Sequence, residues 1–337
     1  MISFDRSSPI LAPSKPLKER RILVVRRDNI GDLICTLPLF GALRHHFPNA
    51  HLGALVNSYN APLLTDNAYL NQIHIYTKGK HQPQTSVYRQ GWDRLTLLRH
   101  IRQQHYDLAI LAGTGVRRET RLFLRAAGIT QHILDHAGGA ATHHEVERLY
   151  ALLAPLGIQG HPAQPCLTPD PARVRALQVQ WAAAGINHPF AIHISAREEH
   201  NRWPLSHFID LIQQGTARGL RFIVLWAPGD PTKPEHPGDD LRAQTLLNHC
   251  QGLPVLGVPT PDLSALAVAL AAARTMIGAD GGHCHIAAAV NTPVIGLYCA
   301  HKVTQWRPYG SGHVILEGKV VADISVQAVL KALASSS

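Results

Sequence analysis

The stretch GADGGHCHIAAAV, residues 278–290, joins an acid and a pair of glycines to a run of small apolar residues. The segments on either side, ARTMI and NTPVIGLY, are short and apolar, which is typical of buried strands. The alanine-rich part between them is typical of a helix. The resulting order of strand, tight turn, helix and strand is the repeating unit of α/β proteins with a parallel sheet.

The same alternation runs through the whole chain. Apolar strand-like segments occupy residues 21–27, 50–57, 70–76, 106–113, 189–195, 220–227 and 253–258. Segments with helical character occupy residues 31–47, 92–105, 118–128, 143–157, 172–185, 204–219, 239–250, 262–273 and 323–334. Strands that alternate with helices predict parallel sheets covered on both faces, so the predicted fold class is α/β.

The length and one proline-rich segment predict two domains. A chain of 337 residues is longer than a single hydrophobic core usually supports. Residues 158–172 hold four prolines and no periodicity, which is typical of a linker. We therefore predict a loose N-terminal extension (1–18), an N-terminal domain (19–165), a C-terminal domain (166–322) and a C-terminal helix with a tail (323–337). Two doubly wound domains would face a central cleft, with ligands at the carboxyl ends of the strands.

The charge favours an anionic partner, because the net charge is +9 and the isoelectric point about 9.5. Nucleic acid is disfavoured, since the sequence has no zinc-finger spacing, no RNP-like motif and no long Lys/Arg block. The longest apolar run, residues 263–273, is too short to span a membrane. Five scattered cysteines without a CxxC pair, and a start without an apolar signal segment, lead us to expect a cytoplasmic protein with reduced thiols.

Several common catalytic motifs are missing. The sequence holds no GxGxxG after a strand, no GxxxxGK[ST], no GxSxG and no HExxH. Hydride transfer, ATP-driven work and serine hydrolysis therefore lose their usual sequence support.

The turn in the opening stretch predicts a site for an anion. Asp280 falls at the end of a strand, and we expect Gly281 and Gly282 to adopt positive φ and let backbone approach a ligand. The following helix would point its N terminus at a phosphate, while Asp280 would suit sugar hydroxyls or cap the helix. A metal site is the competing interpretation, but His283 and His285 would point about 200° apart on a helix. We therefore expect no metal.

A second junction, VVRRDNIGDLICTLP (24–38), places Asp32 beside Gly31 at a helix start. Asp32 is a candidate general base, Asp28 is the competing acid, and an acid that only complements the helix dipole is the structural alternative. A third stretch, ISAREEHNRWPLSHF (194–208), brings Arg197 and Arg202 to another strand end, where guanidinium groups could neutralise a diphosphate.

Three segments taken together resemble the heptosyltransferase family, glycosyltransferase family 9, which adds ADP-activated heptose to the inner core of lipopolysaccharide. They are RDNIGDLICTLPLFGALRHHFPNA (27–50), REEHNRWPLSHF (197–208) and ADGGHCHIAAAVNTPVIGLY (279–298). The resemblance spans about residues 20 to 335. It implies the GT-B fold, with two Rossmann-like domains, the acceptor in the first, the nucleotide sugar in the second, and a reaction with inversion.

The resemblance also implies roles for particular residues. Asp32 matches the family's general base. The implied donor-binding residues are Ser195, Ala196, Arg197, Asn201, Arg202, Asp280, Gly281, Gly282 and His285. The implied acceptor-binding residues are Gly31, Arg117, Arg118 and His144. Two departures stand out: Asn201 occupies a position where the family often has lysine, and Gly281 one where serine or threonine is commoner.

The expected partners are a nucleotide sugar and an anionic lipid-linked glycan, with peripheral association at the cytoplasmic face of the inner membrane and no nucleic acid. No obligatory cofactor or metal is expected, because arginines and a helix dipole can hold the diphosphate. Two alternatives stay open: transfer of another nucleotide-activated sugar or to a different acceptor, and a catalytically silent nucleotide-sugar-binding module.

Overall fold

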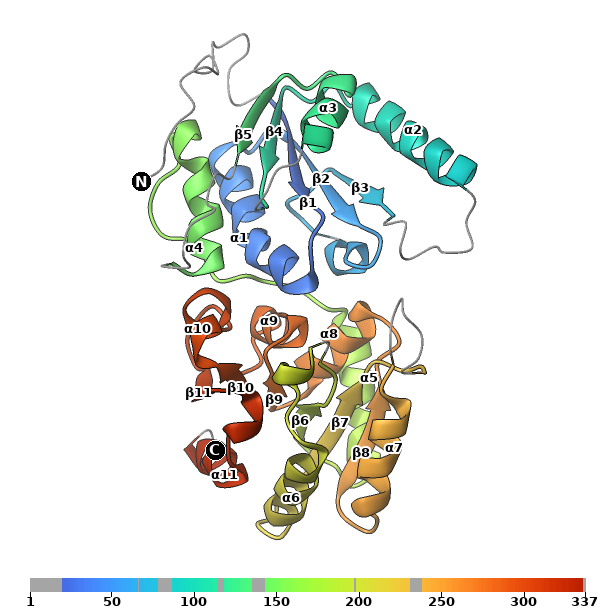
Figure 1. Ribbon diagram of the computed structural model, residues 1–337, viewed down its shortest axis with the longest axis vertical. Helices are drawn as coiled ribbons and strands as arrows, with labels where there is room; N and C mark the ends of the chain where they lie inside the picture. The colour runs from blue at the N-terminus through green and yellow to red at the C-terminus, as the bar shows by residue number, and fades with distance from the viewer. Residues whose placement is uncertain are drawn as a thin grey trace. The chain divides into compact units, whose positions relative to one another are not determined.

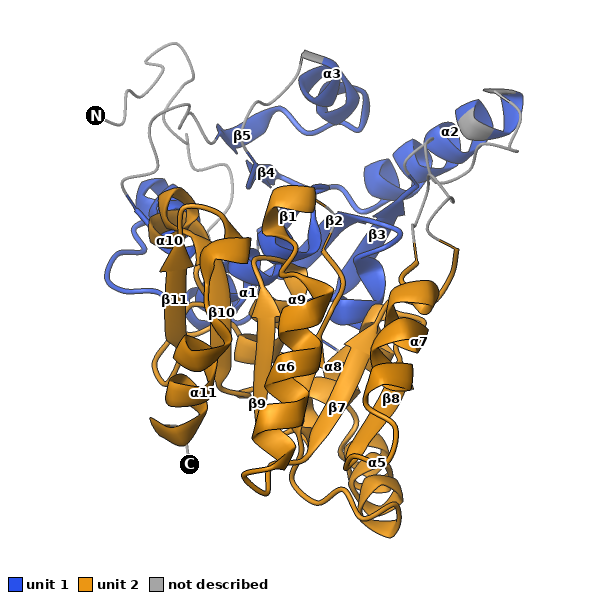
Figure 2. Cartoon of the chain, turned by 60° about the horizontal axis from the view of Figure 1, so that its bottom comes forward, with its two compact units in different colours: residues 1–163 blue, residues 164–337 orange. Residues whose placement is uncertain are grey.

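The computed structural model describes residues 20–65, 67–77, 87–113, 118–134, 143–196, 198–230 and 238–335, without the side chains of Val87, Gln90 and Arg118. The predicted N-terminal extension (1–18), Arg117 and Arg197 lie outside the described residues. The chain divides into two compact units, residues 1–163 and 164–337, whereas the sequence prediction places the division between residues 165 and 166 (Figure 2).

Unit 1 is built on a parallel sheet with strand order β3-β2-β1-β4-β5 (Figure 1). Its strands are β1 (Arg21–Arg26), β2 (His51–Asn57), β3 (Gln72–Tyr76), β4 (Leu108–Leu111) and β5 (Gln131–Leu134). Its helices are α1 (Ile30–His46), α2 (Val87–Gln103), α3 (Arg118–Ala126) and α4 (Glu145–Tyr150), with 3-10 helices at Ala61–Leu64 and Ala151–Leu156.

Both faces of this sheet are covered, as the apolar strands predict. Helices α2 and α3 lie against one face, where Ile101 and Leu124 join a core with Leu23, Val25 and Leu111. Helices α1 and α4 pack against each other on the other face. Burial of both faces explains why these strands are almost uniformly apolar rather than alternating.

Unit 2 holds a second parallel sheet, with strand order β11-β10-β9-β6-β7-β8. Its strands are β6 (Phe190–His193), β7 (Phe222–Trp226), β8 (Val255–Pro259), β9 (Thr275–Ala279), β10 (Val294–Cys299) and β11 (Val314–Gly318). Its helices are α5 (Pro171–Ala183), α6 (Leu205–Thr216), α7 (Asp240–His249), α8 (Leu263–Ala272), α9 (Gly282–Ala289), α10 (Ala300–Trp306) and α11 (Val326–Ser335), with 3-10 helices at Glu199–Asn201 and Val321–Asp323.

The predicted α/β class is confirmed in both units, and the opening stretch is the junction from β9 to α9. Three elements were not predicted: β5, α10 and β11. Each has only four to seven residues, so its periodicity is too brief to distinguish from a loop. Helix α2 also begins at Val87, five residues before the predicted start at residue 92.

The predicted helical segment 143–157 ends where expected, because Gly157 ends the 3-10 helix Ala151–Leu156 in the left-handed region, with φ of 80°. Within the described ranges, we find no helix that is both long and apolar enough to cross a membrane.

Candidate functional site

Two of the predicted site residues, Asp32 and Asp280, follow strands beside the point where the strand order reverses in each sheet. In unit 1 the chain moves outward from β1 to β2 and β3 on one side, and to β4 and β5 on the other. In unit 2 the reversal lies between β6 and β9. In open α/β sheets, ligands bind at the carboxyl ends of the strands beside such a switch point. Asp32 follows β1, and Asp280 follows β9.

Asp32 lies in the first turn of α1, with its side chain 13% exposed. Its Oδ2 accepts a hydrogen bond of 2.9 Å from the backbone N–H of Asn29, the residue that caps the helix. Its Oδ1 accepts from Nη2 of Arg26. Asp32 therefore also has a structural role at the helix start, where the structural alternative placed it as an acid that complements the helix dipole. A carboxylate has about four acceptor sites, so both contacts leave room for a substrate hydroxyl.

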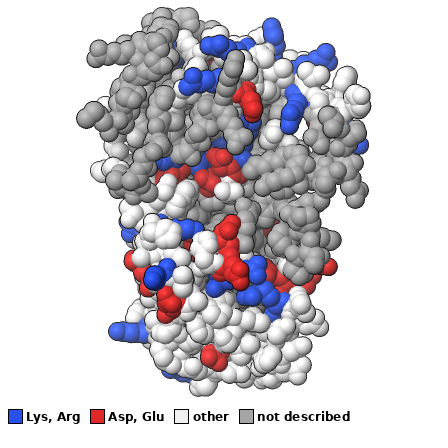
Figure 3. Space-filling model, in the orientation of Figure 1, with Lys and Arg blue, Asp and Glu red and all other residues white. Residues whose placement is uncertain are grey.

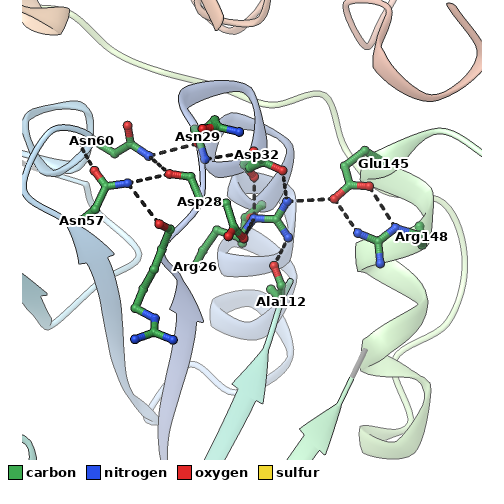
Figure 4. A network of polar contacts seen from close by, with 11 residues as sticks. Arg26, Asp28, Asn29, Asp32, Asn57, Asn60, Ala112, Glu145 and Arg148 are labelled. Atoms are coloured by element: carbon green, nitrogen blue, oxygen red, sulfur yellow. Dashed lines mark hydrogen bonds and ion pairs between the residues drawn. The ribbon is translucent and has the colours of Figure 1, made fainter. Parts of the chain in front are cut away.

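Arg26, at the end of β1, is the centre of a buried network (Figure 4). Its Nη2 pairs with Asp32 and, at 2.9 Å, with Oε1 of Glu145 at the start of α4. Its Nη1 donates to the carbonyl of Ala112, just after β4. Arg148 donates to both carboxylate oxygens of Glu145, at 2.5 and 2.9 Å. One guanidinium thus ties two strands and two helices to the carboxylate of Asp32.

The charges in this network reinforce one another. Burial disfavours the charged form of Arg26, but Asp32, Glu145 and Asp28 more than offset this, so the pKa of Arg26 is raised overall. Burial and the nearby charge of Glu145 raise the pKa of the Cys35 thiol well above its usual value. Cys35 therefore stays protonated and does not compete as a nucleophile.

The turn between β1 and α1 is held from β2 and the residues that follow it. The side-chain amide of Asn57 donates to the carbonyl of Asp28 at 2.6 Å, and that of Asn60 to the carbonyl of Asn29 at 3.0 Å (Figure 4). A Cβ at Gly113, after β4, would lie 2.9 Å from Oδ2 of Asp28. These contacts fix the backbone that carries Asp32.

Asp28, the competing acid, is placed differently. Its side chain is 49% exposed and lies 3.4 Å from Nε of Arg26. Asp32 is the more buried of the two and contacts a terminal nitrogen of the guanidinium. The structure therefore favours Asp32 as the carboxylate with a fixed orientation.

Of the four predicted acceptor residues, the structure fully describes two, Gly31 and His144. Gly31 is buried in the first turn of α1, next to Asp32. His144 is 3% exposed, and its Nδ1 accepts from the backbone N–H of Val146 as the N-terminal cap of α4. It thus has a structural role, and contact with an acceptor stays a prediction. Arg118 begins α3, but its side chain, like all of Arg117, lies outside the described residues.

In unit 2, Asp280 lies directly after β9 and is paired with a cation. Its Oδ2 is 3.2 Å from Nζ of Lys302 in α10 and accepts a hydrogen bond of 3.4 Å from the side-chain amide of Asn201. The side chain of Asp280 is 12% exposed. The lysine that the resemblance leads one to expect at position 201 is absent, but Lys302 brings its charge to the same carboxylate.

Positive φ at the two glycines was a wrong prediction. Gly281 has φ of 177°, extended backbone that any residue adopts, and Gly282 begins α9 in helical conformation. The glycine at 281 is required for a steric reason instead, because a Cβ there would lie 2.6 Å from Cε1 of the His283 ring. This ring also approaches Gly278, where a Cβ would lie 3.0 Å from its Nε2.

His283 turns inward and stacks on His193 at the end of β6, with ring centroids 3.9 Å apart. Its Nε2 lies 2.8 Å from the carbonyl oxygen of Ala279. Burial lowers the pKa of His193 to about 4 and that of His283 well below its usual value. Both imidazoles are therefore neutral at pH 7, and their buried pairing fixes α9 against the sheet.

The two neighbours of His283 are also buried. Burial raises the pKa of the Cys284 thiol to about 12. His285 is 3% exposed and lies edge-on to Trp306, with centroids 6.3 Å apart. Among the described residues, no group of three or more histidine, cysteine or acidic side chains is arranged to hold a metal ion.

The remaining predicted donor residues follow β6. The hydroxyl of Ser195 accepts from the backbone N–H of Ala227, and the carbonyl of Ala196 accepts a 3.0 Å hydrogen bond from Nε of Arg202. Burial and the positive charge of Arg202 lower the pKa of Arg242, near the start of α7. Among the residues that the structure describes, the Nε and Nη2 atoms of Arg242 have no hydrogen-bond partner, although Asp239 lies 3.7 Å from Nε. The positive charges of Arg202 and Arg242 thus repel each other near the carboxyl ends of β6 and β7, which favours an anion near them.

Sequence reasoning missed several residues of the site, namely Arg26, Glu145, Lys302, Arg242 and His193. Arg26 and Glu145 stand in two segments singled out for other residues, VVRRD and HHEVE. A buried position for an arginine at a strand end is a signal that it pairs with carboxylates. Lys302 gave no signal, because α10 itself was not predicted.

Comparison with known proteins agrees with this architecture. The family model described as glycosyltransferase family 9 (heptosyltransferase) matches residues 108–329, a range that begins after Asp32. A lipopolysaccharide heptosyltransferase 3 of Escherichia coli is 24% identical over 303 residues, 84% of this chain and 85% of the relative. The same enzyme from strain K12 is 26% identical over 299 residues, 83% of this chain and 82% of the relative.

Solved structures share the fold. A family 9 glycosyltransferase from Veillonella parvula has a TM-score of 0.79 at 16% identity and covers 96% of this chain and 98% of its own. The ADP-heptose lipopolysaccharide heptosyltransferase II of E. coli has a TM-score of 0.76 at 18% identity and covers 94% and 98%. These likenesses show that the two parallel-sheet units form a GT-B fold. Because the family model matches well over half of the residues, the chain belongs to glycosyltransferase family 9, the heptosyltransferase family, and is a glycosyltransferase.

Proposed function

We propose that this enzyme transfers heptose, with inversion, from ADP-heptose to a hydroxyl of the lipopolysaccharide inner core. The observation that carries the proposal is the carboxylate of Asp32, held by Arg26 at the switch point of unit 1. The donor is taken from the name of the E. coli ADP-heptose lipopolysaccharide heptosyltransferase II, and the acceptor from relatives such as the E. coli lipopolysaccharide heptosyltransferase 3.

The chemistry is a single displacement. The acceptor oxygen forms a bond to the anomeric carbon of the donor, the bond from that carbon to the diphosphate oxygen breaks, and the electron pair leaves with ADP. The acceptor proton passes to Asp32, which must come within about 3 Å of the hydroxyl. Arg26 and the N–H of Asn29 hold the carboxylate in a fixed orientation for this transfer.

Unit 2 would hold the donor. The backbone N–H groups that begin α9 are unpaired within the helix and suit a phosphate. Lys302 neutralises Asp280, so this acid need not repel the diphosphate. Arg202 and Arg242 add positive charge after β6 and β7. Fixed cations and N–H groups of this kind stabilise the charge that grows on the leaving diphosphate, so the proposal requires no metal ion.

The direct test is incubation of the purified enzyme with ADP-heptose and a delipidated inner-core oligosaccharide. We expect release of ADP together with an acceptor whose mass increases by one heptose. ADP release without acceptor modification would mean donor hydrolysis, and the proposed acceptor would then be wrong.

The donor is tested separately by thermal shift with a panel of nucleotide sugars. We expect ADP-linked sugars to raise the melting temperature more than UDP- or GDP-linked ones. A larger shift with another nucleotide would favour the remaining alternative, a family 9 enzyme for a different donor.

A further inference from the structure

Helix α2 exposes an apolar stripe on the surface of unit 1. Tyr88, Trp92 and Leu95 are 92%, 66% and 55% exposed. Their spacing of four and three residues places them on one face of the helix. Single exposed apolar residues are ordinary, but large aromatic and aliphatic side chains in register along one helix indicate a contact surface.

The opposite face of α2 is the one that packs against the core of unit 1. Ile101 is fully buried, and Leu97 and Leu98 pack against the same core as Leu124 of α3. The stripe is therefore not the core-facing side of the helix. In Figures 1 and 2, the N-terminal end of α2, which carries Tyr88 and Trp92, extends beyond the sheet.

Exposed arginines continue the stripe and lie on the neighbouring helix. Arg99 lies four residues after Leu95, continues the same face and is exposed. Helix α3, which packs beside α2, adds the exposed Leu122 between Arg121 and Arg125, both also exposed. Lys and Arg side chains gather over this part of unit 1 in Figure 3.

The charge of the whole chain is also divided unequally between the two units. Residues 1–163 contain 19 Lys and Arg against 11 Asp and Glu, and residues 164–337 contain 13 against 12. Unit 1 thus carries +8 of the net +9, and unit 2 carries +1. A charge asymmetry of this size between two units of one chain points to an anionic partner that meets unit 1.

We propose that the α2 face, defined by Tyr88, Trp92, Leu95 and Arg99, docks on the surface of an anionic lipid bilayer. Tyrosine and tryptophan suit a membrane–water interface because one end of each side chain is apolar and the other polar. Arginines beside them attract anionic headgroups. A bilayer accepts a projecting helix, whereas a protein partner would need a matching groove. The inference deepens the proposed function, on which it rests only for the lipid-linked nature of the acceptor.

The first test is sedimentation of the full-length enzyme with vesicles. Vesicles of phosphatidylcholine with about 30 mol% phosphatidylglycerol should bind the enzyme, and phosphatidylcholine alone should not. Binding should weaken by about ten-fold or more in the double variant Tyr88→Ser, Trp92→Ser and in Arg99→Glu. The matched controls are Leu241→Ser, at a residue 66% exposed on α7, and Arg218→Glu, an exposed arginine of unit 2. Both controls should bind as the unchanged enzyme does.

The second test uses the intrinsic fluorescence of Trp92. It is the exposed tryptophan, since Trp181 and Trp203 are buried and Trp226 and Trp306 partly so. Anionic vesicles should shift the emission to shorter wavelength, and brominated lipid should quench it. Trp92→Phe should abolish both changes.

Two results would overturn the docking surface: vesicle binding unaffected in the double variant, or emission of Trp92 unchanged in vesicles that bind the enzyme. Self-association that depends on Trp92, without vesicle binding, would likewise replace the bilayer by a second copy of the chain. Activity on a delipidated acceptor separates this question from the proposed function. All α2 variants should keep full activity on the delipidated acceptor. An enzyme that binds vesicles but transfers no heptose would refute the proposed function and leave the docking surface intact.

Discussion

At the scale of single residues, the site depends on Arg26 more than on any group that the sequence singled out. The carboxylate of Asp32 needs a fixed position to accept a proton, and it lies on a helix end, where side chains are usually mobile. Arg26 provides the fixed position, and Glu145 holds Arg26 in turn, because both are buried and paired. The carboxylate of Asp32, the candidate general base, is thus positioned by side chains from β1 and α4.

Replacement of Glu145 tests this positioning. Glu145→Gln removes a buried charge that two arginines contact, so the free energy of unfolding should fall by about 3 kcal/mol. In the folded enzyme, kcat should drop by about ten-fold while the KM for the donor stays unchanged. Chemical unfolding and steady-state kinetics measure the two effects.

The matched control is Glu147→Gln, at an exposed acid on the same helix, which should change neither quantity. In an Asp32→Asn background, Glu145→Gln should cause no further loss of rate. An additional loss there would show that Glu145 acts by a route other than Asp32.

The position of Asp32, the candidate general base, could be recognised from the sequence, but the partners of its carboxylate could not. Asp32 stands in a recognisable strand–turn–helix junction, so local pattern is enough to find it. Arg26 and Glu145 are separated by 119 residues, and only the tertiary fold brings them together. The prediction of positive φ at Gly281 failed for a similar reason: the constraint comes from the ring of His283 and not from the turn itself.

At the scale of elements, α10 completes the candidate donor site. Its Lys302 pairs with Asp280 across the junction of β9 and α9. The helix is short and follows β10 directly, so its sequence, AHKVTQW, has too few residues to show a period. The longer helices of both units were predicted because their apolar residues repeat over several turns, and most strands because they are continuous apolar runs.

Replacement of Lys302 should weaken donor binding. Lys302→Gln leaves the carboxylate of Asp280 uncompensated near the expected diphosphate, so the Kd for ADP should rise by about ten-fold. Calorimetric titration with ADP measures this. Lys319→Gln, at an exposed lysine after β11, is the control and should bind ADP normally. Unchanged affinity in Lys302→Gln would exclude Lys302 from the donor site.

The stack of His193 on His283 links β6 to α9 and makes unit 2 sensitive to acid. The pKa of His193 is about 4 in the folded protein, below the usual value of 6.5, so the unfolded chain binds a proton more readily. The contribution of neutral His193 to the free energy of unfolding is therefore fully present above pH 6.5, and it is lost as the pH falls toward 4. Between pH 7 and pH 5, His193 alone should cost about 2 kcal/mol of unfolding free energy.

The variant His193→Phe keeps a planar ring in the stack and removes the titration. Its unfolding free energy should fall less between pH 7 and pH 5 than that of the unchanged protein, as measured by chemical unfolding. His249→Phe, at an exposed histidine of α7, is the control and should keep the full pH dependence. Equal pH dependence in His193→Phe and the unchanged protein would contradict the assignment.

At the scale of the whole molecule, the candidate base and the groups proposed for donor binding lie in different units. Unit 1 carries the candidate base and almost all of the net charge, and unit 2 carries the helix end and the cations proposed for the donor. The order of the two α/β units was predictable, since alternating patterns and a proline-rich linker are visible in the sequence. The charge asymmetry was also present in the composition, but the α2 face became evident only from the exposure of individual side chains.

Because the candidate base and the proposed donor-binding groups lie in different units, we expect a substitution of the base to stop transfer without weakening donor binding. The most direct measurement compares Asp32→Asn with Asp28→Asn for transfer to a delipidated acceptor and for ADP affinity. We predict that Asp32→Asn lowers kcat by about a thousand-fold or more while its Kd for ADP stays within about two-fold, and that Asp28→Asn keeps most of its activity. Transfer at the normal rate by Asp32→Asn, or its loss in Asp28→Asn alone, would contradict the account.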